Sequence, residues 1–137
     1  MIKKVLLILC VFEFIAVSFA ADKPSNSKVV AYYFHGNYRC PTCRKLEQYS
    51  REAIESNFKN ELILGKLAFA AVNIDEKGNE HFMKDYQLYT KSLVISLVKG
   101  DKEIKSKNLV KIWEYVSNKQ EFYSYVTEEI KKFLKEL

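Results

Sequence analysis

The chain has 137 residues, a length that suits one domain and not two. Its 22 basic and 17 acidic side chains leave a formal net charge of +5, and the two signs alternate along the sequence without long runs. Mild, mixed charge is typical of a solvated protein surface and argues against a nucleic-acid partner. With 48% hydrophobic residues, the chain can build one packed core.

Residues 1–20 predict a signal peptide. Lys3 and Lys4 give a basic start, residues 5–17 are mostly apolar, and Ser18 to Ala20 form a small-x-small cleavage site. Glu13 interrupts the apolar stretch, which is also short for a membrane span of about 20 residues. We therefore expect export to a bacterial periplasm, with an uncleaved N-terminal anchor as the alternative.

After cleavage, we expect no stable membrane insertion. Residues 21–28 are polar and predict a linker, which leaves residues 29–137 as the domain. Val29 to Phe34 form a continuous apolar run that predicts a strand covered on both faces. A loop over residues 35–39 then leads into a helix, which we expect to begin at Cys40.

Pro41 stands at the first position of that helix, where its missing N–H costs nothing. We expect the buried stripe of the helix to contain Leu46, Ala53, Ile54 and Phe58.

Further along the chain, residues 67–74 predict a second buried strand. Asp75 is expected to cap a helix that runs to about Leu88, with Phe82 and Tyr86 on one face. Residues 93–98 predict a third strand, residues 99–102 a turn, and residues 103–110 a returning strand.

The C-terminal region predicts one more helix. Asn118 and Glu121 resemble a capping box, and apolar residues follow at helical spacing: Phe122, Val126, Ile130, Phe133 and Leu137. We expect Trp113 and most tyrosines in the core. The order β-α-β-α-β-β-α predicts an α/β fold, with a central four-stranded mixed sheet and helices on its faces.

The sequence Cys40-Pro41-Thr42-Cys43 is the most informative motif. Two cysteines separated by two residues, at a strand-to-helix junction, have the geometry of a dithiol that closes and reopens as a disulfide. The remaining cysteine, Cys10, lies in the predicted signal peptide. A static structural disulfide is the alternative, although so short a loop would stabilise the fold little.

The spacing also predicts a role for each cysteine. Cys40 is the expected nucleophile, because unpaired N–H groups at a helix N-terminus and the neighbouring Arg39 both favour a thiolate. Its pKa should therefore lie below the free value of about 8.5. Cys43, one turn later and more buried, is expected to resolve the mixed disulfide. His35 is a candidate proton shuttle, with a solvated loop residue as the alternative.

A zinc site is the competing use of these side chains. Cys40, Cys43, His35 and His81 supply four donors, but His81 is expected on a helix far from the dithiol. We therefore assign no metal ligands and no cofactor. Tyr38, beside the motif, is a candidate for a hydrophobic docking surface.

Together these residues resemble the thioredoxin fold from Val29 to Leu137. The similar pieces are the first strand, the cysteine motif that opens a helix, Tyr86-Gln87-Leu88 before the third strand, and the hairpin after it. The dipeptide Pro41-Thr42 resembles the proline-first dipeptides of glutaredoxins and oxidising periplasmic enzymes. That resemblance implies a less reducing potential than that of thioredoxin.

A narrower resemblance covers residues 33–36, 39–43 and 86–94. These segments look like a small family of exported bacterial thioredoxin-like proteins, described as subunits of a nitroaromatic reductase linked to arsenic resistance. The resemblance implies a redox partner subunit.

The sequence departs from the thioredoxin pattern at two places. Ser92 stands where thioredoxins carry a cis-proline that faces the dithiol, so either the bond is trans or strain is held by the fold. Ser92 could still offer backbone groups to an extended partner peptide, as that position does in thioredoxins. The first strand also lacks the buried acid of thioredoxins, and His35 is the nearest titratable substitute.

Two functions follow as hypotheses. The first is an exported thiol-disulfide oxidoreductase that acts on protein thiols and disulfides, with Cys40 attacking and Cys43 resolving. The second is an accessory subunit that relays electrons in a reductase complex or holds a soft metal or metalloid. A thioredoxin-shaped interaction domain with a dormant disulfide is a third possibility.

Overall fold

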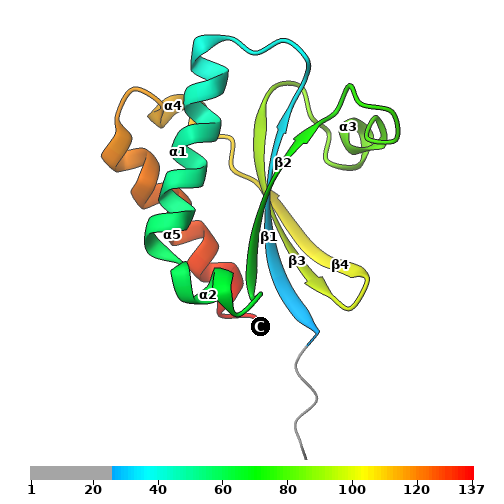
Figure 1. The fold of residues 1–137 in the computed structure, drawn as a ribbon, viewed down its shortest axis with the longest axis vertical. Coiled ribbons are helices and arrows are strands. Elements are labelled where there is room, and N and C mark those ends of the chain that lie inside the picture. The colour runs from blue at the N-terminus through cyan, green and yellow to red at the C-terminus, as the bar shows by residue number, and fades with distance from the viewer. Residues whose placement is uncertain (1–25) are drawn as a thin grey trace, which may run out of the picture.

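The computed structural model describes residues 26–137 (Figure 1). The predicted signal peptide and most of the predicted linker lie outside this range, and the first strand begins within the last two linker residues. The elements in chain order are β1 (Ser27–His35), α1 (Pro41–Asn57), α2 (Lys59–Ile63), β2 (Leu67–Asn73), α3 (His81–Asp85), β3 (Ser92–Lys99), β4 (Lys102–Asn108), α4 (Ile112–Tyr115) and α5 (Lys119–Leu134).

The four strands form one mixed sheet in the order β2-β1-β3-β4. β1 pairs with β2 in parallel and with β3 antiparallel, and β3 pairs antiparallel with β4. A parallel pair needs a crossover, and α1 with α2 supplies it. The predicted α/β class is therefore confirmed, with a four-stranded mixed sheet flanked by helices.

Helices α1 and α5 lie together on one side of the sheet, and α3 lies on the other (Figure 1). The larger core cluster joins β1 and β3 to α1 and α5, and it includes Tyr33, Leu46, Ile95 and Phe122, none of which is exposed. The second cluster, on the opposite face, is built around Phe34, Leu88 and Val94. β1 is thus covered on both faces, as its continuous apolar sequence predicts.

The predicted helix from Asp75 to about Leu88 is wrong. Only α3 is helical there, because the preceding residues form turns and Gly78 adopts a positive φ of 97°. Asp75 does not cap a helix: its Oδ2 atom instead accepts a hydrogen bond from the Asn37 N–H at 2.7 Å. Phe82 and Tyr86 nevertheless face the sheet, where they pack around Phe34.

Two short helices, α2 and α4, were not predicted. Trp113 lies on α4, and it is not a core residue: 37% of its surface is exposed, while its indole Nε1–H donates to the Lys91 carbonyl at 2.9 Å. The predicted capping box is confirmed in part, since the Asn118 side chain accepts a hydrogen bond from the Glu121 N–H.

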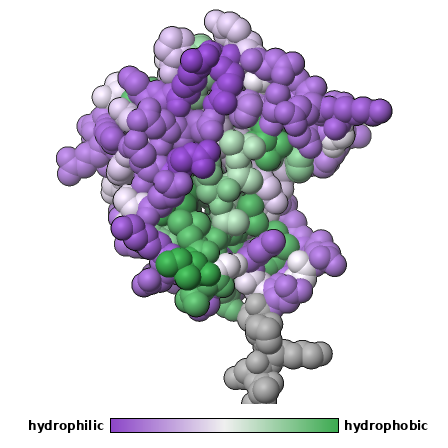
Figure 2. Space-filling view, in the orientation of Figure 1, coloured by the Kyte–Doolittle hydropathy of each residue, from purple (hydrophilic) through white to green (hydrophobic). Residues whose placement is uncertain are grey.

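Apolar side chains also gather on the outer surface, over α2 and the edge strand β2 (Figure 2). Ile63 and Leu64 are 82% and 67% exposed there, beside the half-buried Phe69. This surface lies at the C-terminal end of α1, far from the cysteine motif at the other end (Figure 1). Within residues 26–137, none of the helices combines the length and the hydropathy that crossing a bilayer would require.

Candidate functional site

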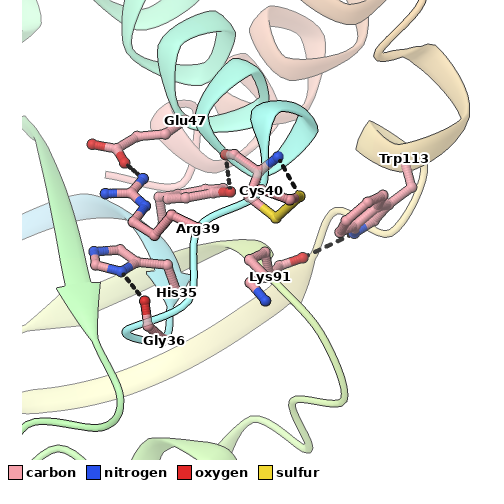
Figure 3. The surroundings of a disulfide bond; sticks show 9 residues. His35, Gly36, Arg39, Cys40, Glu47, Lys91 and Trp113 are labelled. Atoms are coloured by element: carbon pink, nitrogen blue, oxygen red, sulfur yellow. Dashed lines mark hydrogen bonds and ion pairs between the residues drawn. A yellow bond between two sulfur atoms is a disulfide. The ribbon is translucent and has the colours of Figure 1, made fainter.

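The cysteine motif begins α1 as the sequence predicts. The loop after β1 ends at Cys40, which is the N-cap of the helix with φ −70° and ψ 163°, and Pro41 follows in the first turn. The Cys43 N–H donates to the Cys40 sulfur at 3.1 Å, so a sulfur atom occupies the place of the usual capping oxygen (Figure 3).

Cys40 and Cys43 form a disulfide, and their Cα atoms are 5.0 Å apart. The two cysteines are not equally exposed. Cys43 is 2% exposed, whereas Cys40 is half-buried at the mouth of the helix. Thr42 is half-buried and Pro41 is exposed, so the outer side of the motif faces solvent. Cys40 is therefore the more exposed residue of the bonded pair.

Tyr33 contacts the cysteine motif through the Cys43 carbonyl and was not among the predicted site residues. It lies on β1 with no exposed surface, and its hydroxyl donates to the Cys43 carbonyl at 2.6 Å. Burial raises the pKa of Tyr33 to about 12, and the charge of Arg39 opposes this shift only in part. The available signal was alternation along β1, which places Tyr33 on the same face as Val29 and Ala31.

The positive charge of Arg39 is paired. Its guanidinium forms an ion pair with the Glu47 carboxylate, which also binds Arg51 at 3.2 Å. Figure 3 shows the Arg39 side chain directed toward Glu47 and away from the disulfide. The N-terminus of α1 adds a positive potential at Cys40 that does not depend on Arg39.

His35 is the last residue of β1 and lies on the same face of the strand as Tyr33. Its Nδ1 atom lies 3.0 Å from the Gly36 carbonyl oxygen, and its ring stacks on Tyr33 with centroids 6.3 Å apart. Figure 3 shows the imidazole directed away from the sulfur atoms. The contact to a carbonyl, which can only accept, assigns the proton to Nδ1.

Ser92 begins β3 opposite Phe34. All peptide bonds of residues 26–137 are trans, which decides between the two alternatives that the sequence left open. The Ser92 side chain is 4% exposed and its hydroxyl donates to the Thr90 carbonyl at 2.8 Å. Lys91, the preceding residue, lies beside the disulfide in Figure 3, and its carbonyl accepts the hydrogen bond from the Trp113 indole.

A groove of about 260 Å³ lies beside this segment. Its lining comes from the end of β1 and the loop after it, from the first residues after β2, and from α3 and the stretch between α3 and β3. It includes His35, Tyr38, Leu88, Tyr89 and Lys91. Tyr38 and Tyr89 are 76% and 95% exposed, and the Lys91 ammonium lies 5.7 Å from the centre of the Tyr38 ring. Tyr38 thus stands on the surface beside the motif, where a docking residue is expected.

The four donors of the considered zinc site do not come together. His81 lies on α3 and pairs with Asp85 at 2.7 Å. In the part of the chain that the structure describes, no three side chains of His, Cys, Asp or Glu are grouped closely enough to hold a metal ion.

Comparisons with known proteins give only distant likenesses. No protein-family model matches the chain, and no curated protein does. Among solved structures, oxidised thioredoxin O2 from Arabidopsis thaliana is 16% identical with a TM-score of 0.42, over 70% of this chain and 76% of that one. Thioredoxin f2 from Chlamydomonas reinhardtii is 12% identical with a TM-score of 0.42, over 69% and 78%. The thioredoxin of Fasciola hepatica is 19% identical with a TM-score of 0.38, over 66% and 79%.

The thioredoxin-like fold therefore rests on the topology of this chain. The sheet has the strand order β2-β1-β3-β4, which combines a parallel strand-helix-strand unit with an antiparallel hairpin, as the resemblance implies. The last helix, α5, packs on one face of this sheet. The cysteine pair lies where β1 passes into α1. Chemically, an accessible sulfur bonded to a buried one at a helix N-terminus is suited to thiol-disulfide exchange.

Proposed function

We propose that the protein is an exported thiol-disulfide oxidoreductase that acts on protein thiols and disulfides. The observation that carries this proposal is the unequal exposure of the bonded pair: Cys40 is half-buried at the start of α1, and Cys43 is buried behind it. A static bridge has no need of an accessible sulfur, whereas exchange requires one sulfur in reach of a partner and one held back.

In the reducing direction, the Cys40 thiolate attacks one sulfur of a partner disulfide, and a mixed disulfide forms as the first partner thiolate leaves. Cys43 then loses its proton and attacks the Cys40 sulfur, which releases the second partner thiolate. Two electrons pass to the partner, whose two thiolates take up the proton lost by Cys43 and one proton from solvent, and the Cys40–Cys43 disulfide remains. The reverse sequence oxidises a partner dithiol.

The groove beside Lys91 is the proposed docking place for the partner. It is bordered by exposed aromatic rings at Tyr38 and Tyr89, and Tyr38 lies two residues before Cys40 in the loop that leads into α1. Aromatic rims of this kind bind extended apolar segments. The partner would thus be a protein whose cysteine lies in an extended, apolar stretch.

Residues 1–20 support the proposal of export to the periplasm, because their basic start and apolar run are those of a signal peptide. An oxidising compartment also suits a protein that cycles through a disulfide. The narrower resemblance adds a more specific proposal, in which the partner is another subunit of a reductase. The same two-electron exchange at Cys40 and Cys43 would serve there, and neither step calls for a metal or a cofactor.

Replacing Cys40 with serine is expected to abolish exchange. Oxidised glutathione would convert the reduced wild-type protein to its disulfide form, while Cys40→Ser would stay unmodified, because the remaining Cys43 is only 2% exposed. The measurement is the loss of free thiols with time, read by alkylation and mass. Rapid modification of Cys40→Ser would contradict the assignment of the nucleophile.

A matched control is Thr42→Ser, which changes the dipeptide between the cysteines and leaves both sulfurs in place. It should exchange at a rate within about threefold of the wild type, because the helix N-terminus that stabilises the thiolate is unchanged.

A further inference from the structure

Tyr33 links the sheet to the dithiol through a single buried hydrogen bond. Its hydroxyl donates to the Cys43 carbonyl at 2.6 Å, across ten positions of sequence, from a side chain with no exposed surface. We propose that Tyr33 is a positioning residue whose hydroxyl favours the reduced dithiol over the disulfide, and so sets how oxidising the protein is. This inference rests on the proposed function.

The hydrogen bond continues into the cysteine motif. The Cys43 carbonyl belongs to the same peptide group as the Arg44 N–H, which donates to the Cys40 carbonyl at 3.1 Å. The phenol, that peptide group and the Cys40 backbone therefore form a chain of hydrogen bonds pointing toward the N-terminus of α1. The neighbouring Cys43 N–H donates directly to the Cys40 sulfur.

This series of hydrogen bonds stabilises the reduced and the oxidised state to different extents. Donation from the phenol polarises the peptide group between Cys43 and Arg44, and successive hydrogen bonds strengthen one another in a low-dielectric interior. The positive ends of these dipoles point toward the start of the helix, where reduction leaves a thiolate on Cys40. A charged thiolate gains more from that field than a neutral disulfide sulfur does, so the reduced state gains stability.

No other side chain of β1 can take this role. The strand has no carboxylate, and the imidazole of His35 is directed away from the sulfurs (Figure 3). Because burial raises the pKa of Tyr33 to about 12, the phenol keeps its proton throughout the physiological range. It acts there as a fixed donor and not as an acid or a base.

The test compares Tyr33→Phe with Tyr32→Phe in equilibrium with glutathione, where the disulfide and two reduced glutathiones yield the dithiol and one oxidised glutathione. Tyr32 is the control because it lies next along β1 and packs on the opposite face against Phe82 and Tyr86. Loss of the hydroxyl should make the dithiol less favoured in Tyr33→Phe, by at most about tenfold, because only the part of the hydrogen bond's contribution that differs between the two redox states counts. A tenfold change equals about 30 mV toward a more reducing potential. Tyr32→Phe should match the wild type.

A merely structural role would give a different result. If the hydroxyl only holds α1 on the sheet, Tyr33→Phe destabilises the oxidised and reduced proteins equally, and urea unfolding of each form shows equal losses with no shift in the equilibrium. An equilibrium constant equal to that of the wild type, or a shift toward the dithiol, would overturn the inference.

A second measurement covers the case in which Tyr33→Phe does not fold. In wild-type protein labelled at tyrosine, the carbon that bears the Tyr33 hydroxyl should change its NMR resonance on reduction, while that of Tyr32 should not. An unchanged Tyr33 resonance would overturn the inference. Failure of the wild-type protein to exchange with glutathione would instead overturn the proposed function, so the two failures are distinguishable.

Discussion

A Cys43→Ser variant is expected to accumulate as a stable mixed disulfide on Cys40. The Cys40 thiolate can still attack oxidised glutathione and release one glutathione thiolate, because α1 begins as before. Serine cannot then displace the attached group, since its hydroxyl is a far weaker nucleophile than a thiolate. Nearly all of the variant should carry one glutathionyl group, whereas the wild-type protein resolves to its internal disulfide.

The readout is intact mass before and after addition of dithiothreitol, which should remove the attached group completely. The buried position of Cys43, at 2% exposure, predicts the opposite outcome for Cys40→Ser, which should take up no glutathione. Equal labelling of the two variants would show that the sulfurs do not differ in access, and the assignment of attacking and resolving residues would fail.

Replacing Leu46 with alanine is expected to cost the fold about 2–5 kcal/mol, as for other buried leucines. Leu46 is fully buried, lies one turn after Cys43 on α1, and belongs to the core cluster that contains Tyr33 and Phe122. The free energy of unfolding of a small domain is about 5–15 kcal/mol, so the loss should be plain in urea titrations of the oxidised protein.

Lys45→Ala is the matched control, because Lys45 is the exposed neighbour of Leu46 on the same helix. Its effect should stay within about 0.5 kcal/mol. If Leu46→Ala also cost less than about 1 kcal/mol, α1 would not be packed on the sheet as described, and the placement of the dithiol above Tyr33 would lose its support.

The sequence predicted the fold where patterns are strong and local. The apolar run of β1, the proline after Cys40 and the apolar positions of α1 and α5 each identify their element. Two of the expected positions lie outside their helices: Phe58 follows α1 directly and is buried, and Leu137 lies beyond α5 and is half-buried. The prediction of a helix at Asp75 was wrong because an aspartate at the end of a strand can serve a turn as readily as a cap. Here it binds the Asn37 N–H instead.

The site was predicted less completely, because its contacts depend on tertiary packing. Periodicity could place Tyr33 on the helix side of β1, but the length and direction of its hydrogen bond to Cys43 depend on how α1 sits on the sheet. The same holds for Arg39. Its position beside Cys40 suggested a cation near the sulfur, while the fold brings Glu47, two turns along α1, into contact with it.

The central claim is that the Cys40–Cys43 pair is a working redox couple, and its reduction potential tests that claim most directly. Equilibrating the purified protein across a series of glutathione or dithiothreitol redox buffers, with alkylation of free thiols at each point, gives this potential. We predict a single two-electron transition above about −300 mV, in the range of exchangeable disulfides. A value below about −300 mV would identify an inert structural bridge and contradict the account.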